Sequence, residues 1–262
     1  MMAIIQNQNR CYLSTEWTPT MDINGSVALV TGANRGIGQA IAEELLTRGA
    51  SKVYAAVRNP ASVTDDRLVP IALEVTDPGS VAAAAERASD VQIVVNNAGI
   101  GRPSNPLQAT LDDARAELET NYLGLVSVTN AFAPALASRG GGAFVNMLSV
   151  VSWVAMPHLA TYSASKAAAW SFTNAARTQL ATQGIEVVGV HVGYVDTDLT
   201  AALDGDKIAP ALVATAALDA LQAGVPEALV DEFSRTVKAG LSDDQNLIYP
   251  SIREQFAVAA AA

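Results

Sequence analysis

The chain has 262 residues, half of them hydrophobic, with 26 acidic against 16 basic side chains and a formal net charge of −10. This acidic balance argues against nucleic acid or an anionic membrane as the main partner, and no apolar run reaches membrane-spanning length. The single cysteine, Cys11, cannot form an internal disulfide, which fits a cytoplasmic location.

The first twenty residues differ from the rest of the chain. They are polar and unpatterned, and they lack the basic start and long apolar segment of a secretory signal. We therefore expect residues 1–20 to be a flexible N-terminal extension. The remaining length suits a single domain over residues 21–262.

Short apolar segments alternate with segments of helical periodicity from Gly25 onward. The predicted strands are residues 27–32, 52–58, 69–75, 91–99, 142–149 and 185–193. The predicted helices are residues 39–50, 78–88, 111–138, 161–182 and 207–222, followed by a short strand at 227–230 and a helical segment at 231–241. Near-continuous apolar strands between helices indicate a parallel sheet covered on both faces. Right-handed crossovers then give a Rossmann-like, doubly wound α/β fold with three layers, α/β/α.

The segment TGANRGIGQA, residues 31–40, joins the first predicted strand to the first helix. Its glycines lack a Cβ, so the backbone can turn sharply and approach a ligand closely. The helix after this turn presents unsatisfied N–H groups and the positive end of its dipole, which suit a pyrophosphate. Plain turn glycines are the alternative, but a strand before them and a helix after them favour a dinucleotide. The residues expected to bind it here are Gly32, Asn34, Gly36, Ile37 and Gly38.

The second predicted strand bears on which dinucleotide binds. An NAD site usually has Asp or Glu near the end of this strand, to accept hydrogen bonds from the ribose 2′-OH. This chain has Arg58 near that place, and Arg35 lies inside the glycine turn. Two guanidinium groups could clamp a 2′-phosphate, so we expect NADP(H) rather than NAD. Two solvated surface arginines are the alternative.

Five motifs occur in order over roughly residues 25–200. They are TGANRGIG, NNAG at 96–99, Asn121 in ETNYLG, Ser149 in NMLSVVS, and YSASK at 162–166. Together they resemble the short-chain dehydrogenase/reductase family. The resemblance implies that Tyr162 donates or accepts the proton and that Lys166 lowers its pKa and binds the nicotinamide ribose. It implies further that Ser149 holds the substrate oxygen and Asn121 supports a water leading to Lys166, with Asn97 and Gly99 lining the cofactor site.

The chemistry of the Tyr162–Lys166 pair agrees with these roles. Side chains four residues apart share one helix face, and an ordinary tyrosine has a pKa of about 10. An ammonium and a positively charged nicotinamide beside it are expected to move that pKa toward neutrality. For an isolated Y-x-x-x-K, an exposed helix with incidental polar residues is the favoured interpretation, and the other motifs reverse that preference.

Residues near the YSASK motif are weaker candidates. We expect Ser152 to support a loop or helix and His191, in a strand pattern, to be structural. Candidate substrate contacts, with packing under a loop as the alternative, are Trp153, Met156, His158 and Tyr194.

The chain departs from the family pattern at three places. Glu74, before Val75, stands where the family often has Asp near the adenine. Val192 replaces the proline of the P-G segment, which makes that loop less rigid, while Val195 and Thr197 remain expected cofactor contacts. The region after residue 200 lacks the frequent glycine-rich ending.

The sequence therefore predicts an NADP(H)-dependent oxidoreductase that interconverts a ketone or aldehyde with the corresponding alcohol, without a metal. An NAD-dependent alcohol dehydrogenase and a dinucleotide-sensing protein without turnover are the alternatives. The resemblance implies a homodimer or homotetramer, with helices 111–138 and 161–182 at the seam.

Overall fold

The centre of the molecule is one parallel sheet of seven strands, in the order β3-β2-β1-β4-β5-β6-β7. The computed structural model describes residues 21–201 and 205–254, so the expected N-terminal extension lies outside the described residues. Strand order reverses between β1 and β4, where the chain crosses from one half of the sheet to the other. The doubly wound α/β fold predicted from the sequence is confirmed.

The elements occur in the predicted order. The strands are β1 (Val27–Thr31), β2 (Lys52–Val57), β3 (Val69–Ala72), β4 (Ile93–Asn96), β5 (Gly142–Met147), β6 (Ile185–His191) and β7 (Glu227–Leu229). The α-helices are α1 (Gly36–Thr47), α2 (Pro78–Arg87), α3 (Leu111–Leu118), α4 (Gly124–Ser138), α5 (Ala160–Leu180), α6 (Pro210–Gln222), α7 (Glu232–Gly240) and α8 (Asp244–Leu247). Short 3₁₀ turns include η3 (Val150–Ser152) and η5 (Asp198–Thr200).

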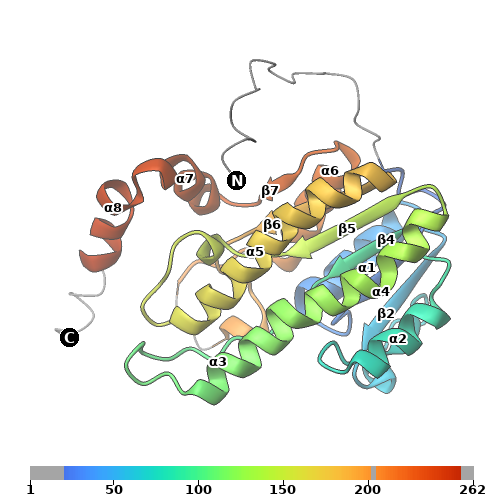
Figure 1. Cartoon of the computed structure of the whole chain (residues 1–262), viewed down its shortest axis with the longest axis horizontal. Helices are drawn as coiled ribbons and strands as arrows, with labels where there is room; N and C mark the ends of the chain where they lie inside the picture. The colour runs from blue at the N-terminus through green and yellow to red at the C-terminus, as the bar shows by residue number, and fades with distance from the viewer. Residues whose placement is uncertain (1–20, 202–204, 255–262) are drawn as a thin grey trace, which may run out of the picture.

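The five central strands, β2, β1, β4, β5 and β6, contribute side chains to two hydrophobic cores, one on either face of the sheet. In β1, Ala28 and Val30 pack with α1 and α6, whereas Leu29 packs with α2, α4 and α5. This alternation explains why the strands are apolar along their whole length. Figure 1 shows α3 and α4 running on as one long rod beside α5, over one face of the sheet.

The long helix predicted at 111–138 is interrupted. A π-helical turn, η2 (Glu119–Leu123), separates α3 from α4 and contains Asn121. Such turns are rare and often occur at functional sites. Strands predicted at 69–75 and 91–99 are shorter than expected because residues 73–76 and 97–101 leave the sheet to line a cleft. None of the helices in the described ranges is long and apolar enough to cross a membrane.

Candidate active site

A cleft of about 1800 Å³ lies at the carboxyl ends of the strands, beside the point where strand order reverses. Ligands of doubly wound sheets bind at this position. It runs from the glycine turn to Tyr162 on α5. The predicted residues that line it are Gly32, Asn34, Arg35, Gly36, Ile37, Arg58, Glu74, Val75, Asn97, Gly99, Tyr162, Lys166, Tyr194, Val195 and Thr197.

The glycine turn has the shape that a pyrophosphate requires. Gly32 and Gly36 have φ of +68° and +55°, a region that side chains rarely adopt. Gly38 lies behind the turn, where a Cβ would overlap the carbonyl oxygen of Gly32 and the side-chain amide nitrogen of Asn97. Asn97 donates through Nδ2 to the carbonyl of Thr31 at 2.8 Å, which ties β4 to the turn. Because α1 starts at Gly36 without a side-chain cap, its first N–H groups remain available for a phosphate.

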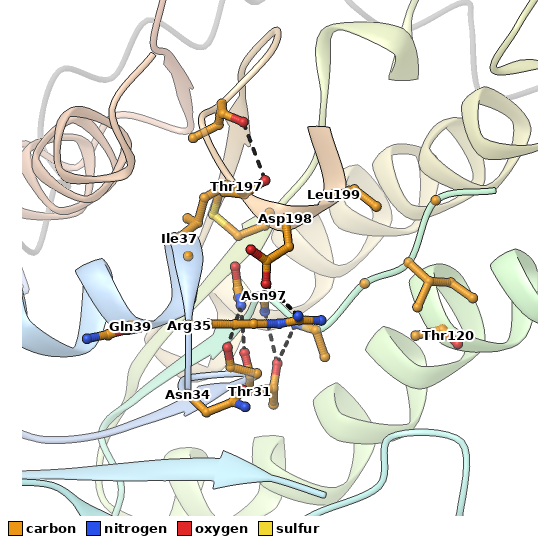
Figure 2. A pocket seen from close by; sticks show the side chains of 18 of the residues that line it. Thr31, Asn34, Arg35, Ile37, Gln39, Asn97, Thr120, Thr197, Asp198 and Leu199 are labelled. Atoms are coloured by element: carbon orange, nitrogen blue, oxygen red, sulfur yellow. Dashed lines mark hydrogen bonds and ion pairs between the residues drawn. The ribbon is translucent and has the colours of Figure 1, made fainter. Parts of the chain in front are cut away.

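The adenine end of the cleft is only partly as predicted. Arg58 comes directly after β2, is exposed and lines the cleft. Arg35 instead forms an ion pair with Asp198, Nη1 to Oδ2 at 2.6 Å, and Figure 2 shows the two side chains meeting across the cleft. Glu74 accepts hydrogen bonds from the N–H and hydroxyl of Thr76 at 3.2 and 3.0 Å. Of the two arginines expected to form a clamp, Arg35 therefore has part of its guanidinium, Nη1, bound to Asp198.

The catalytic end brings Tyr162 and Lys166 together on the first turns of α5. The Nζ of Lys166 lies 5.8 Å from the Tyr162 ring centroid and donates to the carbonyl oxygen of Met147 at 2.8 Å. Asn121 donates through Nδ2 to Ile100 O and to Ser165 Oγ, both at 2.9 Å. Its Oδ1 accepts from the Ile100 N–H at 2.8 Å, so the carboxamide is held on both sides.

Burial dominates the electrostatics of this pair. Burial raises the pKa of the Tyr162 phenol, and the negative charge of Glu117 raises it further. Burial lowers the pKa of the Lys166 ammonium to about 8. The predicted lowering of the Tyr162 pKa also involves the positive charge of a bound nicotinamide, and it therefore stays a prediction.

Ser149 lies just after β5 and caps the 3₁₀ turn η3. Its Oγ donates to Val192 O and accepts from Val151 N–H, both at 3.3 Å. Ser152 accepts from the Ser149 N–H at 3.2 Å, the supporting role expected of it. The Nδ1 of His191 lies 3.1 Å from the Ser149 carbonyl oxygen, and because a carbonyl can only accept, His191 supports the backbone at Ser149.

Two of the expected substrate contacts, Trp153 and Met156, are not among the residues that line the cleft. They pack in an apolar cluster with Val237 and Ile252 from the C-terminal region, and Tyr162 packs against the same cluster. Trp153 also stacks on the ring of His191, with centroids 3.8 Å apart. Both residues therefore lie behind the wall of the cleft, and their contact with substrate stays a prediction.

His158 and Tyr194 behave differently from these two. The Nε2 of His158 lies 3.2 Å from the Tyr194 hydroxyl, and Tyr194 lines the cleft. His158 is therefore placed to orient Tyr194 at the cleft mouth. Burial lowers the pKa of His158, which favours the neutral imidazole.

Sequence reasoning missed three acidic side chains that shape the site, namely Glu117, Asp198 and Asp231. Asp231, the N-cap of α7, accepts from the Gly193 N–H at 2.7 Å and from the Ser234 N–H at 2.6 Å. The Gly193 bond anchors the segment where Val192 replaces the family proline. No local sequence signal marks a bond between residues so far apart.

Comparison with known proteins agrees with this geometry. A family model described as short chain dehydrogenase matches residues 26–208. The chain belongs to the short-chain dehydrogenase/reductase family. Among its curated relatives is the 3-oxoacyl-[acyl-carrier-protein] reductase of Escherichia coli, 35% identical over 196 residues that cover 71% of this chain and 80% of that protein.

Solved structures of other short-chain dehydrogenases share the fold. One from Burkholderia cenocepacia, in complex with NADP, is 41% identical with a TM-score of 0.85, covering 88% of this chain and 99% of that one. A 3-ketoacyl-(acyl-carrier-protein) reductase from Brucella melitensis, complexed with NADH, is 29% identical with a TM-score of 0.72, covering 77% of this chain and 93% of that one.

Proposed function

We propose that this short-chain dehydrogenase is an NADP(H)-dependent reductase that converts a ketone or aldehyde to the corresponding alcohol, and can run in reverse. The observation that carries the proposal is that the glycine turn and the Tyr162–Lys166 pair line one continuous cleft. A nicotinamide dinucleotide, when bound, supplies the hydride.

The cofactor is assigned from the residues that would hold it. The turn at Gly32 and Gly36 and the open N-terminus of α1 suit the pyrophosphate. Arg58, exposed beside the end of β2, suits a 2′-phosphate. The NADP complex of the Burkholderia relative supports this choice over NAD.

Three side chains account for the chemistry. In reduction, Tyr162 gives its proton to the carbonyl oxygen as hydride reaches the carbon. The Ser149 hydroxyl donates to the same oxygen as negative charge develops on it. Its present bonds of 3.3 Å are long and weak, so little is lost when it turns toward substrate. Lys166 then stabilises the phenolate that remains.

The substrate is proposed to be a carbonyl compound with an apolar arm. The wall of the cleft beyond Tyr162 includes Pro103, Leu159, Leu199 and the ring of Tyr194. These side chains bind an apolar part of a substrate more favourably than a charged part. The 3-oxoacyl reductases among the relatives support reduction of a ketone.

Replacing Tyr162 by Phe tests the proposal. The ring stays, so NADPH should bind with unchanged affinity, whereas carbonyl reduction should fall by roughly 10² to 10⁴ because the proton donor is lost. Turnover is followed by NADPH absorbance over a panel of ketones and aldehydes, with NADH in parallel. The control is Tyr54→Phe, whose hydroxyl bonds Lys52 and Asp90 near the opposite end of the sheet. Equal turnover in Tyr162→Phe and wild type would reject the assignment.

We further propose a cytoplasmic homodimer joined through α3, α4 and α5. Leu111, Leu118 and Leu123 on this rod are 72%, 38% and 44% exposed, which is unfavourable for apolar side chains unless a partner covers them. Sedimentation should give a dimer or a tetramer, and Leu118→Glu should shift it toward monomer. A wild-type monomer at micromolar concentration would contradict the seam.

A further inference from the structure

Glu117 is a carboxylic acid buried beside the candidate active site. It lies on α3 and is 0% exposed. Burial of an acid is costly unless its oxygens are bonded. Its Oε1 accepts from the backbone N–H of Arg102 at 2.7 Å, whereas its Oε2 has no hydrogen-bond partner within the described residues. Such a group calls for a physical explanation.

The bond to Arg102 belongs to a larger arrangement. Asn121 lies four residues after Glu117 on the same helical rod and bonds both the N–H and the carbonyl of Ile100, at 2.8 and 2.9 Å. Two side chains therefore hold three backbone groups, at Ile100 and at Arg102. In an extended segment alternate residues point their backbone groups the same way, so the two side chains fix the segment as a neighbouring strand would.

The residue between the two held positions lies beside Tyr162. A Cβ on Gly101 would lie 3.5 Å from Cδ2 of Tyr162 and 3.3 Å from Cδ1 of Leu199. Gly101 thus lies within one methyl group of the ring of the proposed proton donor. The Arg102 side chain turns to α3 instead, where Nη1 pairs with Asp113 Oδ1 at 2.7 Å.

We propose that Glu117 is a positioning residue for the reaction: its carboxylate holds the segment from Ile100 to Arg102, and with it Gly101, against the ring of Tyr162. This inference rests on the proposed function. Without the Glu117 bond, the segment keeps its bonds to Asn121 at Ile100 and the exposed Arg102–Asp113 pair, but the backbone of Arg102 is no longer held, and the wall beside the phenol loosens.

The charge of Glu117 has a second effect on the same group. It is one of two causes that raise the pKa of Tyr162, the other being burial. The opposing cation, Lys166, bonds Met147 O, and Arg102 is neutralised by Asp113. Glu117 therefore favours the protonated phenol, the form that donates a proton in carbonyl reduction.

Two variants separate these effects. Glu117→Gln keeps an oxygen for the Arg102 N–H but removes the charge, whereas Glu117→Ala removes both. In hydrogen exchange followed by mass spectrometry, the peptide that contains Arg102 should stay protected in Glu117→Gln and exchange at least tenfold faster in Glu117→Ala, because the lost bond has a charged acceptor. The matched control is Asp112→Ala, which removes an exposed carboxylate on the same helix that pairs with Arg115.

Kinetics test the positioning role itself. In Glu117→Ala, kcat/KM for a carbonyl should fall roughly tenfold or more while the NADPH dissociation constant changes less than about twofold. In Glu117→Gln, kcat/KM at neutral pH should stay close to wild type. In the pH profile of kcat/KM for this variant, the high-pH limb should move to lower pH, because Tyr162 loses its proton more easily without the negative charge of Glu117.

Three results would overturn the inference. The first is Glu117→Ala with wild-type exchange. The second is Glu117→Ala with faster exchange but unchanged kcat/KM, which would make the residue merely structural. The third is a Glu117→Gln variant whose Arg102 peptide stays protected but whose kcat/KM at neutral pH still falls tenfold or more, which would mean that holding the segment does not set the rate. This variant also decides the matter if Glu117→Ala does not fold. If wild type reduces no carbonyl, the proposed function fails, whereas the exchange result still tests whether Glu117 holds the segment.

Discussion

Replacing Gly38 by Ala places one methyl group behind the glycine turn. The added Cβ would overlap the carbonyl oxygen and carbonyl carbon of Gly32 and the Nδ2 of Asn97. Backbone must therefore shift, and overpacking of this kind costs about 1–3 kcal/mol. The gain in helix propensity is at most about 1 kcal/mol. After subtraction of this gain, we expect a net loss of up to about 2 kcal/mol of unfolding free energy.

The same shift should weaken cofactor binding. It moves the first turn of α1 away from the position where its N–H groups meet a pyrophosphate, so the NADPH dissociation constant should rise roughly tenfold or more. Urea unfolding and NADPH fluorescence titration measure the two effects. Gly79→Ala on the first turn of α2 is the control, because its Cβ would meet only the exposed side chain of Asp77, at 3.3 Å. Normal NADPH binding by Gly38→Ala would refute the assignment of the turn as the pyrophosphate site.

Arg58→Glu should raise the NADPH dissociation constant by roughly tenfold or more and leave that of NADH almost unchanged. An unchanged ratio of the two dissociation constants would exclude Arg58 from the 2′-phosphate site. Asp198→Ala removes the ion pair with Arg35, whose two side chains are 68% and 73% exposed. Because such exposed pairs contribute about 0–1 kcal/mol, the affinity for NADPH should rise less than about fivefold. A larger rise would mean that Asp198 closes the cleft. His191, with Nε2 3.7 Å from Oε1, and the donors Lys238 and Trp170 together hold the pKa of Glu227 at about 2, below its ordinary 4.5. About 3 kcal/mol of stability is therefore present above pH 4.5 and lost as pH falls toward 2; urea unfolding from pH 7 to 3 should lose less in Glu227→Gln than in wild type.

The fold could be predicted because each strand and helix has its own pattern of apolar residues within a short stretch of sequence. A strand buried on both faces must be apolar throughout, so segments such as 27–32 stand out from the amphipathic helices between them. The expected site residues could be placed for the same reason, since the carboxyl ends of parallel strands share one edge of the sheet. The predicted strands extended too far at 73–75 and 97–99, where the chain leaves the sheet and lines the cleft.

The substrate side could not be predicted, because apolar residues beside a catalytic motif have the same pattern whether they face a ligand or a core. Trp153 and Met156 face a core that Val237 and Ile252 complete. Those partners lie far along the chain, in the region that departs from the family pattern. Only the folded chain shows that the C-terminal helices cover this side.

The hydrogen bonds and ion pair that shape the site share one property, which explains why no sequence motif predicts them. Glu117 bonds the Arg102 backbone across 15 residues, Asp231 bonds the Gly193 backbone across 38, and Arg35 pairs with Asp198 across 163. Two of the three use a backbone N–H, which every residue except proline provides, so the receiving position carries no distinctive side chain. A lone acid on a helix has many possible partners in sequence, and burial alone distinguishes Glu117 from the exposed acids around it. Burial is a property of the packed α3–α5 pair, and therefore appears only once the tertiary structure is known.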